Sequence, residues 1–152
     1  MEGIQVREAT AHDIPSIVDF QLKMALETES VQLEISVLSA GVQKLVKDPS
    51  KGKYYVAETG GEVIGCLSIT YEWSDWRCGT VIWIQSVYVV EGWRGKGVYK
   101  SMYEFIRSFV VSDPDLIGLR LYVDNSNANA KKVYKGLGMD GDHYSVFEWM
   151  KK

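Results

Sequence analysis

One stretch in the middle of the chain constrains the fold more than any other. It begins with the longest run of β-branched and aromatic residues, Thr80–Val90, which is typical of a buried strand. A loop with glycines and two cations, Glu91–Lys96, leads directly into an amphipathic helical pattern over Gly97–Ser112. A further apolar run, Leu119–Val123, follows. Strand, helix and strand in this order form a right-handed β-α-β unit, so the two strands should be parallel.

The rest of the chain adds helices and antiparallel strands. A first strand is expected around Ile4–Arg7, and Thr10 and Pro15 mark the start of a helix at about Asp13–Leu26. Gly60 and Gly61 form a two-residue turn between two strands, which with Thr80–Val90 make a meander. The remaining expected elements are a helix at Val37–Lys47, strands at Lys53–Thr59 and Glu62–Trp73, a helix at Ala128–Gly136 and a last strand at Tyr144–Met150.

These elements predict a single α/β domain over residues 1–152. Its sheet should be mixed and mostly antiparallel, with one parallel pair and helices on both faces. A length of 152 residues fits one domain, and 46% hydrophobic residues can supply a sizeable core.

Charge and cysteine usage exclude several functional classes. With a net charge of -3, the protein has no overall positive field that would attract nucleic acid. The two cysteines form no C-x-x-C motif, and His12 and His143 are isolated from them and from each other, so no metal site is expected. The first residues carry charges early and no apolar run, so we expect neither a membrane span nor a signal peptide, and a cytoplasmic location.

The loop after the longest strand favours phosphate binding. A helix N-terminus leaves its first N–H groups unpaired and carries partial positive charge, and glycines allow a bulky anion to come close. A Walker A loop is excluded because Val98 and Tyr99 stand where lysine and serine or threonine are required. A Rossmann motif would need glycine at Lys100. The alternative is a glycine-rich turn with no ligand, against which Arg94 and Lys96 argue.

Two motifs, in this order, resemble those of the GNAT superfamily of N-acetyltransferases. The first is Arg/Gln-x-x-Gly-x-Gly/Ala after a V-x-V strand, which Val87, Val89, Arg94 and Gly97 match, whereas Tyr99 departs from the final Gly/Ala. The second is N-x-x-A-x-x-x-Y-x-x-x-G-F. This sequence matches it with Asn127, Ala130, Tyr134, Gly138 and Met139. The resemblance extends over nearly the whole chain.

The resemblance implies acetyl-coenzyme A as co-substrate, with no metal. The backbone of Val87 and Val89 would pair with the pantetheine arm, and Asn127 would contact that arm. The pyrophosphate would be held by the loop and first helical turn, which are Arg94, Gly95, Lys96, Gly97, Val98 and Tyr99. Asn127 is equally suited to be an ordinary N-cap. Tyr134 would protonate the departing thiolate, although helical periodicity alone favours core packing for its ring.

The acceptor is expected to be a small-molecule primary amine, cationic in character, that attacks the thioester directly. Family members often place a glutamate on the central strand as general base, but this sequence has Gln85 there, which cannot accept a proton. Glu27, Glu72 and Gln85 are the predicted acceptor-site residues, and Glu27, Glu29 and Glu72 are the alternative candidate bases. Solvated acidic loops remain the alternative for most of these residues. A homodimer is one assembly that the sequence allows. The alternative function is a non-catalytic acyl-CoA-binding or regulatory domain of the same fold.

Overall fold

The computed structural model describes residues 3–152, which divide into two compact units, 3–120 and 121–152. The first unit contains β1 (Gln5–Glu8), α1 (Ile14–Glu29), α2 (Ile35–Lys47), β2 (Lys53–Thr59), β3 (Glu62–Ser74), β4 (Gly79–Val89), α3 (Val98–Ser112) and β5 (Leu116–Arg120). Single 3-10 turns precede α1 (Ala11–Asp13) and follow β4 (Glu91–Trp93). The second unit contains α4 (Ala128–Gly136).

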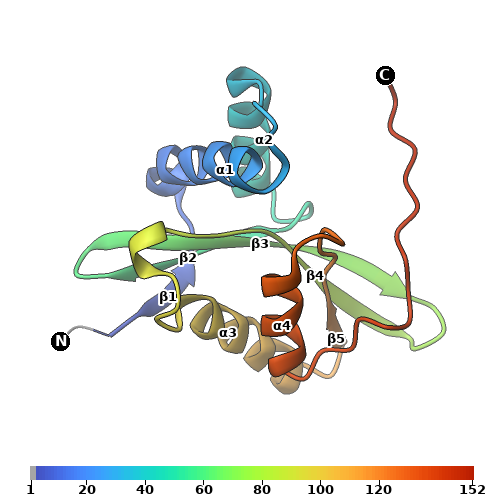
Figure 1. Ribbon diagram of the computed structural model, residues 1–152. Helices are drawn as coiled ribbons and strands as arrows, with labels where there is room; N and C mark the ends of the chain where they lie inside the picture. The colour runs from blue at the N-terminus through green and yellow to red at the C-terminus, as the bar shows by residue number, and fades with distance from the viewer. Residues whose placement is uncertain (1–2) are drawn as a thin grey trace. The chain divides into compact units, whose positions relative to one another are not determined.

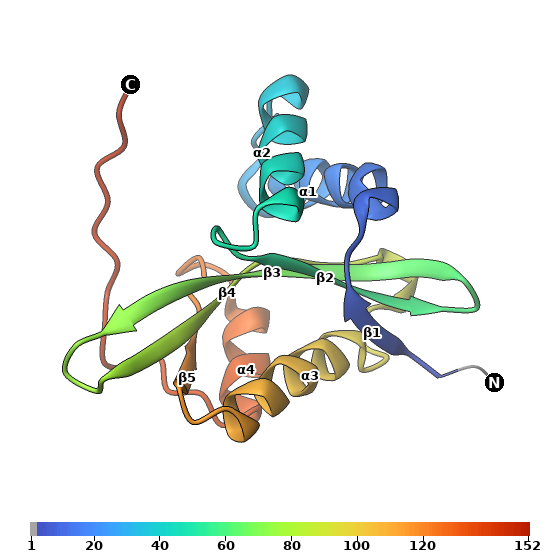
Figure 2. The same cartoon turned by 180° about the vertical axis from the view of Figure 1, so that it is seen from behind.

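The first unit is built on one five-stranded sheet in the order β1-β2-β3-β4-β5. The first three neighbouring pairs are antiparallel, and β4 and β5 are parallel. Helices α1 and α2 cover one face of the sheet and α3 covers the other (Figure 1). The view from behind shows the same arrangement (Figure 2). The predicted mixed sheet with one parallel pair and helices on both faces is therefore confirmed.

Side chains from both faces of the sheet are buried, because helices pack on both. Between the sheet and α1 and α2 lies a cluster of seven buried side chains: Ile17, Phe20, Val42, Tyr54, Val56, Cys66 and Tyr88. On the other face the ring of Tyr55 lies 5.7 Å from that of Phe105 and 5.9 Å from that of Phe109, both on α3. Neighbours along β2 thus point to opposite faces, as a strand requires.

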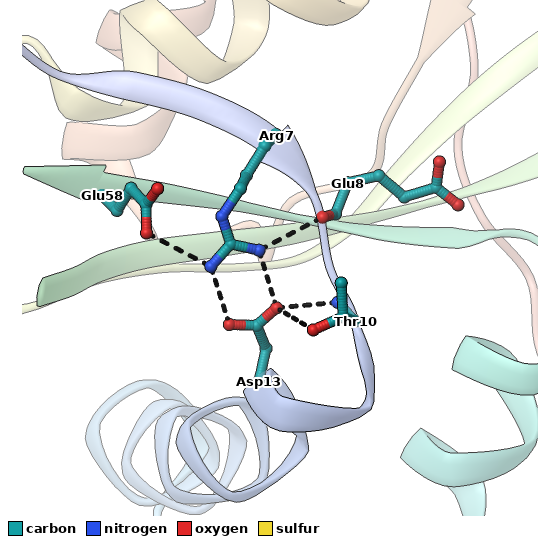
Figure 3. A network of polar contacts seen from close by, with 5 residues as sticks. All are labelled: Arg7, Glu8, Thr10, Asp13 and Glu58. Atoms are coloured by element: carbon teal, nitrogen blue, oxygen red, sulfur yellow. Dashed lines mark hydrogen bonds and ion pairs between the residues drawn. The ribbon is translucent and has the colours of Figure 1, made fainter. Parts of the chain in front are cut away.

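A charged network fixes the start of α1 to the sheet (Figure 3). The Arg7 guanidinium on β1 donates two hydrogen bonds to the Asp13 carboxylate, at 2.8 and 3.0 Å, and one to Glu58 on β2 at 3.2 Å. The backbone N–H of Thr10 also donates to Asp13, at 2.7 Å, which completes the predicted capping box. The Arg7 guanidinium lowers the pKa of Asp13 below its usual value because it stabilises the charged carboxylate.

Two of the expected strands differ from the structure by more than one residue at an end. The strand after α3 spans Leu116–Arg120 instead of Leu119–Val123, because pairing with Thr80 begins directly after the turn at Asp113. The expected last strand, Tyr144–Met150, is wrong, since those residues form neither strand nor helix. A strand pattern needs an adjacent edge to pair with, and the described sheet ends at β5. The helix at Ala128–Gly136 is confirmed.

Candidate functional site

The loop between β4 and α3 has the backbone geometry of an anion cradle. Gly95 and Gly97 have φ values of 75° and 84°, in the left-handed region where glycine is favoured. A Cβ added at either glycine would meet nothing within 4 Å, so the space beside the backbone is open. Gly97 caps α3, whose first N–H groups therefore have no carbonyl partner within the helix. The predicted loop residues, from Arg94 to Tyr99, thus surround a helix N-terminus.

The parallel pairing of β4 with β5 stops halfway along β4. The pairs run from Thr80–Leu116 to Trp83–Arg120, and β4 continues to Val89. The N–H of Val90 donates to the carbonyl of Ile64 on β3 at 2.9 Å. Since backbone polar groups alternate between the two sides of a strand, those of Val87 and Val89 face away from β3. They are thus aimed at the side where β5 no longer pairs with β4.

A bulge in β4 lies just before Val87. Cys66 pairs with Tyr88 and Ser68 with Gln85, so β4 has one extra residue in this interval. Ser86 takes a left-handed φ of 55°, which is uncommon for a residue with a side chain. The buried Gln21 on α1 donates its amide to the Ser86 carbonyl at 3.0 Å. Helix α1 thereby satisfies the carbonyl that the bulge turns out of the β3–β4 ladder.

Arg94 connects the loop to α1. Its Nη2 lies 2.7 Å from Oε2 of Glu27, and its Nε donates to the carbonyl of Val89 at 2.9 Å. The guanidinium carbon also lies 5.4 Å from the ring centroid of Tyr88, within cation–π range. The Tyr88 hydroxyl donates to Glu27 at 3.4 Å. Glu27, predicted to bind the acceptor, is therefore engaged with Arg94 of the β4–α3 loop and with Tyr88.

The other predicted acceptor residues lie on β3 and β4, each with a partner. The Glu72 carboxylate accepts from Arg120 at 2.6 Å and from the Trp83 indole at 3.3 Å. The Gln85 amide donates to the Thr70 hydroxyl at 2.8 Å. Both oxygens of Glu72 are already hydrogen-bonded, and Gln85 acts as a donor to the neighbouring strand.

Asn127 and Tyr134 lie in the second unit. The Asn127 side chain accepts from the backbone N–H of Ala130 at 3.1 Å, so it is the N-cap of α4. This hydrogen bond supports the interpretation of Asn127 as an ordinary N-cap. The N-cap role and the predicted coenzyme contact are compatible with each other. Tyr134 lies in the last turn of α4, and burial raises its pKa above the usual value near 10. Its hydroxyl is consequently protonated at neutral pH.

Sequence analysis did not single out Gln21, Ser86, Tyr88 or Arg120. Gln21 follows the apolar face of α1, where a polar residue among Ile17 and Phe20 could have indicated a buried hydrogen bond. No sequence signal marks the bulge at Ser86, because strand patterns give no direct information on register. Within residues 3–152, no three His, Cys, Asp or Glu side chains gather as metal ligands would. The same residues contain no helix that is both long and apolar enough to cross a bilayer.

Comparison with known proteins identifies the family. Residues 19–139 match the model of the acetyltransferase (GNAT) family. The crystal structure of a possible acetyltransferase from Clostridium difficile 630 is 40% identical, with 98% of each chain covered and a TM-score of 0.91. An aminoglycoside N-acetyltransferase in complex with CoA is 12% identical, with 100% of this chain and 97% of that chain covered and a TM-score of 0.81. A search of curated proteins found no match. Since the family model spans most of the chain, the protein belongs to the GNAT family of acetyltransferases.

Proposed function

We propose that this acetyltransferase moves the acetyl group of acetyl-CoA to a primary amine, by direct attack of the amine on the thioester. The observation that carries the proposal is the end of β4. There the strand loses its parallel partner after Trp83 and runs into a glycine loop at the N-terminus of α3. Exposed strand polar groups followed by a helix N-terminus suit an amide-containing arm that ends in a pyrophosphate.

The residues present fit acetyl-CoA, which would supply the acetyl group as an activated thioester. Val87 and Val89 would hold the pantetheine amides through backbone groups. The N–H groups of Gly95, Gly97, Val98 and Tyr99 would hold the pyrophosphate, beside the positive charge of Lys96. The open space at Gly95 and Gly97 supports this assignment, since a phosphate could reach the backbone there. Asn127 would orient the coenzyme arm while also capping α4.

Tyr134 is proposed as the general acid. Its pKa lies above the usual value for a phenol, because burial disfavours the phenolate. A thiol has a pKa of about 8.5, so its thiolate is a weaker base than a phenolate. As negative charge develops on sulfur in the transition state, the Tyr134 hydroxyl can nevertheless donate a hydrogen bond and then the proton. Protonation at neutral pH keeps this donor available in every catalytic cycle.

The acceptor is proposed to be a small cationic amine. Glu27, Glu72 and Gln85 would line its site, with Glu29 as a nearby carboxylate. An alkylammonium must first lose a proton, which costs about 4.6 kcal/mol at pH 7 for a pKa of about 10.4. Two solved neighbours are aminoglycoside acetyltransferases, at 12% and 15% identity, and they support the fold alone. The proposal therefore rests on the acidic residues near the end of α1 and on β3.

A screen of amines with acetyl-CoA tests this proposal. Cationic amines should be better substrates than neutral amines of similar size, and turnover should weaken as salt rises, because salt screens exposed charges. Free thiol and N-acetylated amine should form in equal amounts. Equal rates for cationic and anionic amines without salt dependence would contradict the cationic acceptor. The alternative, a non-catalytic coenzyme-binding domain, would bind acetyl-CoA and release no thiol with any amine.

We further propose that residues 1–152 act as one acetyltransferase domain. The family match supports this, since residues 19–139 span parts of both compact units. A homodimer is proposed as the assembly.

A further inference from the structure

Three buried side chains from different elements meet at Ser86, the left-handed residue of the β4 bulge. Gln21 of α1 is only 4% exposed, and its Nε2 donates to the Ser86 carbonyl at 3.0 Å. The thiol of the buried Cys66 on β3 lies 3.8 Å from the same oxygen. Tyr54 of β2, also buried, has a side-chain hydrogen bond with Ser86. A buried amide is costly unless it is hydrogen-bonded, so Gln21 and the Ser86 carbonyl hold one another in place.

The strain at Ser86 changes the course of β4. A φ of 55° lies in the left-handed region, which a residue with a side chain seldom adopts. On β3, Ser68 and Cys66 are two residues apart and therefore share a face of the sheet. Their partners on β4, Gln85 and Tyr88, must then also share a face, although three positions separate them. Backbone strain that several surrounding contacts maintain is typical of a functional site.

Gln21 fixes the direction of the Val87 N–H group. The peptide bond between Ser86 and Val87 is trans, and in a trans peptide the C=O and N–H groups point in opposite directions. Because the Ser86 carbonyl points at Gln21, the Val87 N–H points away from it. Beyond Val87, the ring of Phe20 stacks on that of Tyr88, with centroids 5.1 Å apart. Helix α1 therefore holds β4 on both sides of Val87.

Val87 lies toward the reacting end of the proposed coenzyme site. The pairs between β4 and β5 end at Trp83, and the loop proposed to hold the pyrophosphate follows Val89. An arm that runs from this loop back along β4 passes Val89 before Val87, so its thioester lies nearer Val87. Position matters most at this end, because a shift of about 1 Å at the reacting atoms can lower a rate by about a hundredfold.

We propose that Gln21 is a positioning residue for acetyl transfer. By holding the Ser86 carbonyl it directs the Val87 N–H, and so sets where the thioester end of the coenzyme rests. The inference rests on the proposed function, since it requires the coenzyme arm to run along β4. Gln21 would act through this one peptide group without touching the reacting atoms. Its loss should therefore lower the rate of transfer more than the affinity for the coenzyme.

Steady-state kinetics of Gln21→Met test this role. Methionine is similar in length and flexible, and it has no N–H to donate. We expect kcat to fall by about 10–100-fold, while the Kd for acetyl-CoA, measured by calorimetry, changes by less than about threefold. The matched control is Val42→Ala, which removes buried volume from the same core cluster but on α2. This control should also be destabilised, and its kcat should stay close to that of the wild type.

A double variant separates positioning from stability. Ser86→Gly relieves the strain of the left-handed backbone, so adding it to Gln21→Met should raise stability without restoring kcat, because no donor returns. Several results would overturn the positioning role: a wild-type kcat in Gln21→Met, an equal loss in Val42→Ala, recovery in the double variant, or a Kd that rises as much as kcat falls. A wild-type protein that releases no thiol with any amine would instead overturn the proposed function itself.

Discussion

The Nη2 atom of Arg94 lies 2.7 Å from Oε2 of Glu27, although 67 residues separate the two in the chain. This ion pair joins the loop between β4 and α3 to the end of α1, and the hydrogen bond from Arg94 to the Val89 carbonyl joins the same loop to β4. Arg94 therefore fixes the loop between a helix and a strand. In the proposed coenzyme site, the backbone N–H groups near Gly97 would bind the pyrophosphate.

We expect Glu27→Gln to weaken acetyl-CoA binding slightly. Both side chains of the pair are more than 40% exposed, and an exposed ion pair contributes at most about 1 kcal/mol. Isothermal titration should show a Kd that rises by no more than about fivefold, which corresponds to that energy. The matched control is Glu29→Gln, two residues away in the same helix. An equal effect of both substitutions, or tighter binding by Glu27→Gln, would contradict this positioning role.

Gly97→Val should abolish the increase in melting temperature that acetyl-CoA gives to the wild-type protein. Gly97 has a φ of 84°, and valine is strained there. Its side chain would also fill the open space beside the loop backbone. Gly92→Ala is the control, because a Cβ at Gly92 also meets nothing within 4 Å and its φ is not left-handed. A folded Gly97→Val protein with the wild-type shift would place the coenzyme elsewhere.

The bulge at Ser86 predicts two opposite effects on stability. Gln21→Leu removes the 3.0 Å donor to the part-buried Ser86 carbonyl, and should lower the free energy of unfolding by about 1–3 kcal/mol. Ser86→Gly relieves the strain of the left-handed backbone at this position and should raise the free energy of unfolding by up to about 1–2 kcal/mol. Urea denaturation measures both changes. A Ser86→Gly protein that is destabilised as much as Gln21→Leu would show that the backbone at Ser86 is not strained.

Much of the fold followed from residue patterns, and the failures have physical causes. The strand at Lys53–Thr59 and the helix at Ala128–Gly136 were predicted with the observed bounds, because apolar periodicity and glycine turns are local signals. The last strand failed because pairing depends on a partner edge, which a sequence pattern does not contain. The loop at Arg94–Gly97 was found from its glycines and cations. Its ion pair with Glu27 was not, since contacts between distant residues leave no local pattern.

Asp13 should make stability fall in acid. Its pKa is lowered in the folded state by Arg7, so its contribution is present above the unfolded value near 3.9 and is lost as pH falls below about 4. Asp13→Asn should lower the free energy of unfolding by about 1–3 kcal/mol at pH 7, because hydrogen bonds from a charged donor are lost. The difference from wild type should shrink toward pH 3. Denaturation curves that differ equally at both pH values would contradict the assignment.

The most direct test of the central claim is the turnover of Tyr134→Phe, measured as thiol release from acetyl-CoA with the best amine acceptor. The phenylalanine ring can still pack, so only the proton donor is removed. We expect kcat to fall by about 10²–10⁴-fold, the usual value of general acid catalysis, while calorimetry shows nearly unchanged acetyl-CoA affinity. A fall of less than about threefold, well short of that expectation, would contradict a catalytic Tyr134. A wild-type protein that binds acetyl-CoA but releases no thiol with any amine would contradict the acetyl-transfer account itself.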